Sequence, residues 1–367
     1  MGTPAELLFV SSRPRNMEPK NSVGAKYLRL LDRLDLAAAV KGKRTAIKMH
    51  LGAGAGFTTI HPWLVRKLVE KVKEAGAKQV FVTDTPSAVR GAAERGYTQE
   101  TICCPLLPTS GSNDGYYLTR RLRPAFKTLR EIQLAGELAA AEALVDFSHI
   151  KAHGDCGFGG AIKNLAMGAV TNTTRRALHA LEGGIVWDRR KCTRCKVCVE
   201  NCPNHAIRFT ADNQLEVFYH HCKFCQHCVL ICPQHALKMV GGGFKPFQQG
   251  LALAAARVLD NFPAQNVLYI NVLLNITLFC DCWSMTSPTV VPDIGIIAGR
   301  DIVAIEQASL DLVTVKDLIR KSLPPGWPLG AKGHLFERLH HKDPAVAVEH
   351  MEKLGRGTRQ YRLTEVE

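Results

Sequence analysis

The chain has 367 residues, of which 46% are hydrophobic and 22% charged, so it is long enough for two domains and is neither disordered nor fibrous in composition. Its formal net charge of +14 favours acidic partners, but no nucleic-acid-binding module is visible, so specific nucleic-acid binding is not expected. An apolar stretch at residues 266–279 is too short to span a membrane, and residues 1–16 lack the pattern of a secretory signal. We therefore expect a cytoplasmic protein without a membrane segment.

The first part of the chain alternates between predicted strands and predicted helices. Apolar runs typical of strands buried on both faces occur at residues 5–10, 44–51, 79–85 and 142–150. Helical spacing of apolar residues lies between them, at residues 26–40 and 61–76. This order predicts an α/β fold with a mostly parallel sheet flanked by helices.

The middle of the chain contains a duplicated cysteine motif. The spacing C-x2-C-x2-C-x3-C-P occurs at residues 192–203 and again at 222–233, each time followed by x-His-Ala-aliphatic-basic. This spacing is that of bacterial ferredoxins, in which three cysteines of one copy and the fourth of the other copy hold a [4Fe–4S] cluster. We therefore predict two such clusters, one held by Cys192, Cys195, Cys198 and Cys232 and the other by Cys222, Cys225, Cys228 and Cys202.

Zinc knuckles are the alternative interpretation of these cysteines. Zinc sites, however, separate two C-x2-C pairs by a longer loop and do not explain the repeated four-cysteine spacing. Thirteen cysteines in a chain without a secretory signal favour metal ligation over disulfides. Since the cysteines already complete both sites, the nearby histidines are expected to be solvated or packed at the cluster edge; these are His205, His220, His221, His227 and His235.

After the cysteine-rich segment the pattern of strands and helices resumes. Predicted strands lie at residues 266–276 and 293–299, and predicted helices at 250–261 and 301–322. The cysteine-rich segment is therefore predicted to be an α+β insert, residues 186–240, that divides an α/β domain into residues 1–185 and 241–325. Residues 326–367 are rich in proline, glycine and charge, so we expect a peripheral charged tail with one helix at 344–355.

Several motifs occur in a defined order over residues 1–325. They are KMHLG, VTDT, HIKAHGDCGFGGAIKNLAMG, the two cysteine motifs and LFCDCWSMTSPTVVPDIGIIAGRDIVAIEQASLDLV. This combination resembles a family of uncharacterised iron–sulfur centre proteins, which carry a domain of unknown function with an inserted ferredoxin that binds two [4Fe–4S] clusters. The resemblance implies this fold and these clusters but no activity. Relatives tend to have an acidic residue after the His-x-Gly of the second strand, where this chain has GAGAG.

Polar side chains follow the predicted strands at their carboxyl ends, where open α/β sheets bind ligands. They are Lys48 and His50, Asp84, the trio His149, Lys151 and His153, which shares one face of an extended segment, and then Lys163 and Asn164. Together they predict a cationic, proton-donating pocket for an anionic small-molecule substrate, with scattered surface charge as the alternative. The LGAGAGF turn lacks the spacing of a dinucleotide site, so a tight turn is its simplest interpretation.

A second cysteine motif, Cys280-Asp281-Cys282, follows the apolar run at residues 266–279. If the strand continues through it, both thiols face the same side. Such a pair is a redox dithiol, half of a soft-metal site, or two small buried residues. Nearby cations would stabilise a thiolate, and Cys156 would be a third member of the group. The catalytic residues predicted on this basis are Cys280, Cys282, Lys151, His153 and Lys163.

Two functional hypotheses follow from these features. In the first, the protein is an iron–sulfur oxidoreductase, which passes electrons through both clusters to a substrate or metal site in the α/β domain. In the second, it is a non-catalytic electron carrier, or a maturation factor for iron–sulfur or other metal centres, and docks on a partner enzyme. The basic residues 189–191, Arg194 and Lys196 beside the first cluster favour an acidic electron donor such as a ferredoxin or flavodoxin, although a solvated charge run is the simpler alternative.

Overall fold

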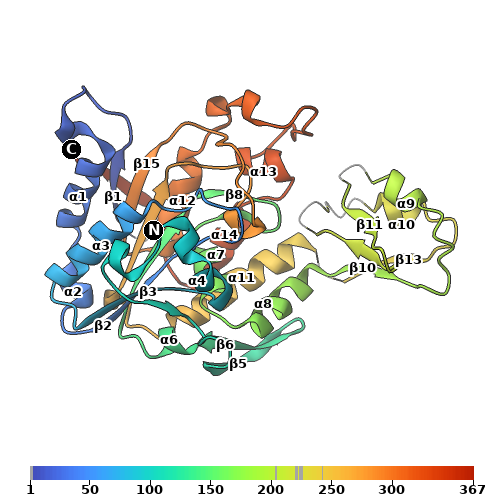
Figure 1. Cartoon of the computed structure of the whole chain (residues 1–367), viewed down its shortest axis with the longest axis horizontal. Coiled ribbons are helices and arrows are strands. Elements are labelled where there is room, and N and C mark those ends of the chain that lie inside the picture. The colour runs from blue at the N-terminus through green and yellow to red at the C-terminus, as the bar shows by residue number, and fades with distance from the viewer. Residues whose placement is uncertain (1–2, 203–204, 220–221, 223–225, 242) are drawn as a thin grey trace.

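The computed structural model describes residues 3–202, 205–219, 222, 226–241 and 243–367. Its centre is an eight-stranded sheet with the strand order β16-β1-β15-β14-β7-β2-β3-β4 (Figure 1). Neighbouring strands are parallel except that β15 runs antiparallel to both β1 and β14. The predicted α/β class with a mostly parallel sheet is therefore confirmed. The strands are β1 (Ala5–Ser11), β2 (Arg44–Lys48), β3 (Gln79–Asp84), β4 (Leu106–Pro108), β7 (Ala143–His149), β14 (Val267–Leu273), β15 (Gly295–Gly299) and β16 (Tyr361–Glu365).

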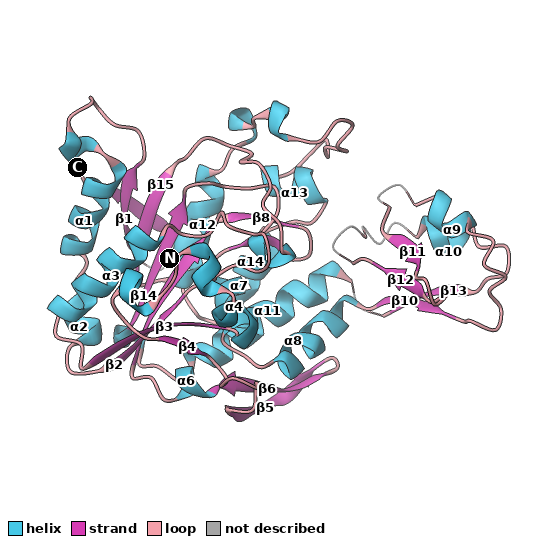
Figure 2. Ribbon diagram, viewed as in Figure 1, coloured by secondary structure: helices cyan, strands magenta, loops and turns pink. Residues whose placement is uncertain are grey.

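Helices cover both faces of the sheet (Figure 2), because successive residues of each strand point to opposite faces. In β2, Ala46 belongs to one hydrophobic core and Ile47 to the other. The first core is shared with α7 (Ala161–Gly168), α11 (Phe244–Leu259), α12 (Ile302–Leu312) and α14 (Ala345–Lys353), and the second with α1 (Val23–Arg33), α2 (Leu36–Val40) and α3 (Pro62–Glu74). Shorter elements connect them: α4 (Pro86–Arg90), α5 (Gln99–Ile102), α6 (Gly136–Ala139), β8 (Lys151–His153), β9 (Gly157–Gly159), α8 (Asn172–His179) and α13 (Leu335–His340).

Within the described part of the chain, no helix is both long enough and apolar enough to cross a membrane.

Two predicted helices are shorter in the structure than in the sequence analysis. Residues 26–40 form two helices, α1 and α2, because the Asp35 side chain accepts a hydrogen bond of 3.1 Å from the Ala38 amide and caps a new helix there. The helix predicted at 301–322 ends at Leu312 and is followed by short 3-10 turns. In both cases the helical backbone ends locally, although the apolar spacing continues in the sequence.

The C-terminal segment differs from the expected peripheral tail. Residues 326–367 form α13, α14 and β16, and β16 pairs in parallel with β1 at the edge of the main sheet. Val348 and Met351 of α14 lie in the core. Most charged residues of this segment are exposed or half-buried, and the apolar residues between them hold it in place. A further hairpin, β5 (Tyr117–Phe126) with β6 (Leu129–Ala135), was not predicted either.

The cysteine-rich segment forms a separate small unit that projects from the body of the molecule, at the right in Figure 1. It contains two short antiparallel pairs, β10 (Gly184–Trp187) with β13 (Leu237–Val240) and β11 (Ile207–Phe209) with β12 (Leu215–Val217), and two helical turns, α9 (Val197–Glu200) and α10 (His227–Leu230). Its backbone repeats as its sequence does. Lys196 and Gln226, which precede the two helical turns, have φ angles of 62° and 65°, and His205 and His235 both have 48°.

Candidate functional site

A pocket of about 290 Å³ lies at the carboxyl ends of β2, β3 and β7. Residues from α7 and from the turn that contains Cys280 and Cys282 complete its wall. The structure thus brings together in one place nearly all the polar residues that the strand ends predicted. Those that line the pocket are Lys48, His50, Asp84, His149, Lys151, Lys163 and Asn164.

A buried network fixes the side chain of His50 in this wall. Lys48 Nζ donates to Asp84 Oδ1 at 3.0 Å and to Asn164 Oδ1 at 2.7 Å. The other oxygen, Asp84 Oδ2, lies 3.2 Å from His50 Nδ1, and because a carboxylate only accepts, that nitrogen carries a proton. Burial raises the pKa of Asp84, but Lys48 and His50 outweigh it and hold this pKa well below its usual value. Gly168 permits the arrangement, since a Cβ there would lie 2.3 Å from Lys48 Nζ.

A second buried ion pair anchors the turn that carries the thiols. Lys151 Nζ donates to Asp281 Oδ2, and both side chains are almost fully buried. Asp281 Oδ1 accepts from the amide and the hydroxyl of Thr58 at 2.9 and 2.7 Å. Burial raises the pKa of Asp281, but the neighbouring Lys151 lowers it below its usual value. Lys151 therefore holds Asp281, and with it the position of the two flanking cysteines.

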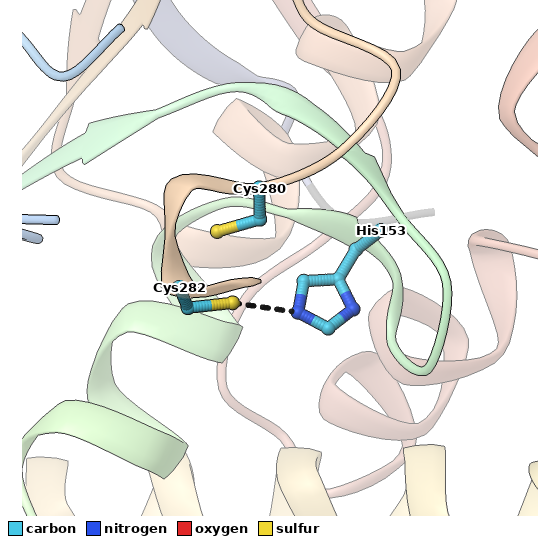
Figure 3. Close-up of side chains that lie close together, drawn as sticks. All are labelled: His153, Cys280 and Cys282. Carbon is cyan, nitrogen blue, oxygen red and sulfur yellow. Dashed lines mark hydrogen bonds between the residues drawn. The ribbon is translucent and has the colours of Figure 1, made fainter. Parts of the chain in front are cut away.

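The strand does not continue through Cys280 and Cys282, so alternation along a strand is not what orients the two thiols. The strand β14 ends at Leu273, and Asp281–Trp283 form a 3-10 turn. The turn nevertheless directs both sulfurs to one place beside His153 (Figure 3). The two sulfur atoms and a ring nitrogen of His153 lie within 4.8 Å of one another. The tight turn thus brings both thiols to the same side, which side-chain alternation along a strand would also have done.

Lys163, in the first turn of α7, provides the positive charge beside the thiols. Its Nζ donates to Cys280 Sγ at 3.5 Å and to Cys282 Sγ at 3.6 Å. The hydrogen bond from Cys282 is the largest contribution that lowers the pKa of Cys280 well below its usual value, and Lys163 and His50 add to it against the effect of burial. The same hydrogen bond, together with burial, raises the pKa of Cys282. The pair therefore holds one thiolate, at Cys280, next to one thiol.

His153 completes the group, and its hydrogen bonds identify its tautomer. Its Nδ1 accepts the amide hydrogens of Asp155 at 3.0 Å and Cys156 at 3.1 Å, so this nitrogen carries no proton. The proton of the neutral ring is therefore on Nε2, which lies 3.3 Å from Cys282 Sγ. His153 acts here as a hydrogen-bond donor to sulfur.

Two other predicted members of the site have different surroundings. Cys156 lies outside the pocket wall, and burial raises the pKa of its thiol well above the usual value. His149 lines the pocket and its Nε2 lies 2.6 Å from the Leu274 carbonyl. Burial and the charge of Lys151 lower the pKa of His149 to about 3, so this ring is neutral. Neither group is placed to carry a positive charge or a thiolate.

The described cysteines of the insert gather in two groups that correspond to the predicted sets. The first set, Cys192, Cys195, Cys198 and Cys232, lines one small cavity of about 20 Å³. Of the second set, Cys202, Cys222 and Cys228 lie close enough to affect one another's charge, and Cys225 lies outside the described residues. Backbone amides of Arg194, Ala206 and Ala236 donate to the sulfurs of Cys192, Cys202 and Cys232 at 3.4, 3.2 and 3.3 Å. His220 and His221 also fall outside the described residues.

Comparison with known proteins identifies the family of the chain. Residues 45–311 match the model of DUF362, described as a domain of unknown function. The chain belongs to this family. A search of curated proteins gave no match.

The solved structures similar to this DUF362 chain are distant from it. A structural-genomics protein from Thermotoga maritima has 10% identity and a TM-score of 0.37, and the match covers 70% of this chain and 51% of that one. The lactate racemase apoprotein from Thermoanaerobacterium thermosaccharolyticum has 12% identity and a TM-score of 0.35, with coverages of 86% and 60%. The chain thus spans between half and three fifths of these proteins, and likenesses of this size carry no functional information.

The sequence patterns did not assign three polar residues to the site. Asp281 was expected only to point away from the thiols, and Thr58, its second partner, gave no signal because it lies in an irregular loop. Asp146 interrupts the apolar run of β7 and could have been noticed there. It accepts from Ser148 Oγ and Asn164 Nδ2 at 2.6 Å each, and burial raises its pKa to about 7.

Proposed function

We propose that this DUF362 protein is an iron–sulfur oxidoreductase. Two [4Fe–4S] clusters in the ferredoxin-like insert would be the source of electrons, and the thiol pair Cys280 and Cys282 in the α/β domain would receive them. The observation that carries the proposal is the position of both sulfurs in the wall of one pocket, 3.5 and 3.6 Å from the ammonium group of Lys163. A carrier that only relays electrons needs no such pocket in its second domain.

The donor atoms of the insert fit iron–sulfur clusters. Both sets contain only cysteines, which are soft ligands suited to iron–sulfur cores. The amide hydrogens that point at three of the sulfurs are typical partners of cluster thiolates, since hydrogen bonds to sulfur tune cluster potentials. Each cluster, when bound, supplies one electron at a time.

The surroundings of Cys280 and Cys282 favour thiol–disulfide chemistry over metal binding. A histidine that binds a metal through Nε2 normally donates its Nδ1 hydrogen to another group. In His153, Nδ1 accepts two amide hydrogens instead, so Nε2 would have to lose its proton and become an imidazolate. The ammonium group of Lys163 would also repel a cation beside both sulfurs. The same residues suit a redox pair, whose thiolate needs a positive charge and a hydrogen-bond donor.

The charges of the pocket support an anionic small-molecule substrate. Lys48 and Lys151 are each paired with a carboxylate. Burial lowers the pKa of His50, but the hydrogen bond to Asp84 and the nearby Cys280 raise it above its usual value, and Arg175 lies at the wall as a further cation. On the insert, the exposed basic residues 189–191, Arg194 and Lys196 lie beside the first cysteine set and support an acidic protein as electron donor.

A second candidate function rests on one observation. The grouping of His153, Cys280 and Cys282 within 4.8 Å has the composition of a soft-metal site, as a metal-centre maturation factor would need. The two proposals differ in what the pocket cysteines bind. A redox pair forms a disulfide reversibly and holds no metal, whereas a maturation site holds a metal ion that is lost when the cysteines are replaced.

Anaerobic purification tests the proposal directly. We expect about eight iron and eight sulfide per chain and an EPR signal on reduction. Oxidation should then join Cys280 and Cys282 in a disulfide, which alkylation and peptide mass spectrometry would detect. A stoichiometric metal ion beyond the clusters, lost in the Cys280→Ser, Cys282→Ser variant, would contradict the redox proposal and support the second candidate. Zinc without sulfide would contradict the cluster assignment.

A further inference from the structure

The insert touches the thiol turn through three aromatic rings, Phe218, Trp283 and Phe279, which we call the aromatic bridge. The ring centroid of Phe218, in the insert, lies 5.2 Å from that of Trp283, with an angle of 70° between the planes. Trp283 in turn stacks on Phe279 with centroids 4.4 Å apart. Phe279 directly precedes Cys280, and Trp283 directly follows Cys282. The bridge therefore encloses the thiol turn at one end and reaches the insert at the other.

Within the insert, the bridge is bonded to the second cysteine set. The amide of Phe218 donates to the Ala206 carbonyl at 2.7 Å, and the amide of Ala206 donates to Cys202 Sγ at 3.2 Å. The Phe218 carbonyl accepts from the Cys222 amide at 3.2 Å. Phe218 is thus one hydrogen bond from Cys222 and two from the sulfur of Cys202.

The first cysteine set has a different environment. Cys195 is exposed, and so are the basic residues 189–191 and Arg194 around it. Cys198 of the first set is buried, and Cys192 and Cys232 are half-buried. The described members of the second set, Cys202, Cys222 and Cys228, are all buried. The two sets are similar in sequence but unequal in position, because the hydrogen bonds of Phe218 among the described residues lead to the second set.

Resting on the proposed function, we propose that the second cysteine set is the exit for electrons and that the aromatic bridge carries them to Cys280 and Cys282. The first set is then the entrance, where an acidic donor protein docks. When their disulfide opens, Cys280 and Cys282 take up two electrons and one proton and become the thiolate of Cys280 and the thiol of Cys282. One electron from each of two reduced [4Fe–4S] clusters balances the step. Lys163 Nζ, which lies 3.6 Å from Cys282 Sγ, delivers this proton and regains one from the solvent in the pocket.

The test follows the opening of this disulfide in the full chain with its clusters. The oxidised protein is reduced with dithionite under argon and quenched with N-ethylmaleimide at intervals, and mass spectrometry counts the modified Cys280 and Cys282. Cluster reduction is followed by EPR in the same samples. We expect Trp283→Leu to slow the appearance of both thiols roughly tenfold or more while the clusters are reduced as in the wild type. Phe218→Ala should have the same effect, and Trp283→Phe should restore most of the rate.

Two controls separate the bridge from other effects. Trp327 also packs on Phe279, with ring centroids 5.7 Å apart, but its Nε1 donates to the Leu339 carbonyl in α13, and it makes no ring contact with the described residues of the insert. The rate of Trp327→Leu should therefore match the wild type. The iron-free chain measures direct reduction by dithionite. If the wild type opens its disulfide no faster than the iron-free chain, the proposed function fails. If the wild type opens its disulfide faster than the iron-free chain but Trp283→Leu opens it at the same rate as the wild type, only the bridge proposal fails. The same conclusion follows if Trp327→Leu slows the opening as much as Trp283→Leu does.

Discussion

Cys280 in the pocket has electrostatic surroundings opposite to those of Cys198 and Cys228 in the insert. In the insert, burial and then the neighbouring sulfurs raise the pKa of Cys198, and the same causes raise the pKa of Cys228 to about 11. In the pocket, the hydrogen bond from Cys282 and the positive charges of Lys163 and His50 lower the pKa of Cys280 well below its usual value. The hydrogen bond to Cys280, together with burial, raises the pKa of Cys282, so Cys280 alone of these four cysteines is made a stronger acid.

This difference assigns different chemistry to the two regions. Sulfurs crowded against one another become thiolates when a metal centre replaces their protons, and metal binding then also stabilises the fold around them. A thiolate held by lysine and histidine needs no metal and is free to react. The insert is therefore a place for clusters, and the pocket is a place for thiol chemistry.

The largest expected effect separates the two regions by their iron content. Replacing Cys198 and Cys228 by serine removes one ligand from each predicted cluster, and most of the roughly eight iron per chain should be lost. Replacing Cys280 and Cys282 by serine should leave the iron unchanged, because these sulfurs are held by protein residues. Iron and sulfide analysis of anaerobically purified variants measures both. Iron loss in the pocket variant would contradict the division.

Lys163→Met removes the positive charge that lowers the pKa of Cys280 in the pocket. Without the ammonium group the pKa of Cys280 rises, and each unit of rise lowers the thiolate fraction about tenfold, so alkylation at pH 7 should slow by about ten- to a hundredfold. The rate should be nearly independent of pH above neutrality in the wild type and should still increase toward pH 9 in the variant. Iodoacetamide labelling with peptide mapping measures both profiles. Lys127→Met, on the exposed β5–β6 hairpin, serves as the control.

Glu306 supports the start of α7, the helix that carries Lys163. Its carboxylate accepts from the amides of Ala161 at 2.8 Å and Ile162 at 3.2 Å, and burial raises its pKa from an ordinary 4.5 to about 7. A raised carboxyl pKa means that the folded chain keeps a proton that the unfolded chain loses. This contribution to the free energy of unfolding is complete below about pH 4.5 and disappears as the pH rises through about 7.

Glu306→Gln should remove that contribution. Between pH 5 and 6.5 the variant's free energy of unfolding should fall less steeply with pH, by up to about 1.4 kcal/mol per pH unit. Urea unfolding followed by tryptophan fluorescence at several pH values measures the slope. Equal slopes in wild type and variant would mean that Glu306 is ionised throughout this range. Asp146, whose pKa is also about 7, keeps its own contribution in both proteins.

The smallest expected effect concerns the entrance to the insert. Replacing Arg189, Arg190 and Lys191 by serine should slow cluster reduction by an acidic ferredoxin severalfold at low salt and flatten its salt dependence, because screening weakens electrostatic steering. Stopped-flow absorbance measures the rates. A variant as fast and as salt-dependent as the wild type would place the donor elsewhere.

The sequence predicted the sheet and most of the pocket but not the turn that completes it. Parallel strands such as β2 and β7 are apolar runs, and their carboxyl ends must lie together, so the sequence alone assigns Lys48 and Lys151 to one site. The position of Cys282 could not be derived in this way. It depends on the long-range ion pair between Lys151 and Asp281, two residues far apart in the chain.

The C-terminal segment and the aromatic bridge illustrate the same limit. Tyr361–Glu365 reads as a charged tail because only its pairing with β1 makes it a strand. Phe218 and Trp283 are ordinary aromatic residues in the sequence, and only the folded chain brings their rings together. Patterns of spacing reveal ligands and strand ends, whereas contacts between distant segments require the structure.

The most direct test of the central claim is an anaerobic coulometric titration of the oxidised chain. If the clusters and the thiol pair are both redox centres, the wild type should take up about four electrons, one for each of two clusters and two for the disulfide. The Cys280→Ser, Cys282→Ser variant, with its clusters intact, should take up about two. Equal electron uptake by the two proteins would contradict the claim that the pocket cysteines accept electrons.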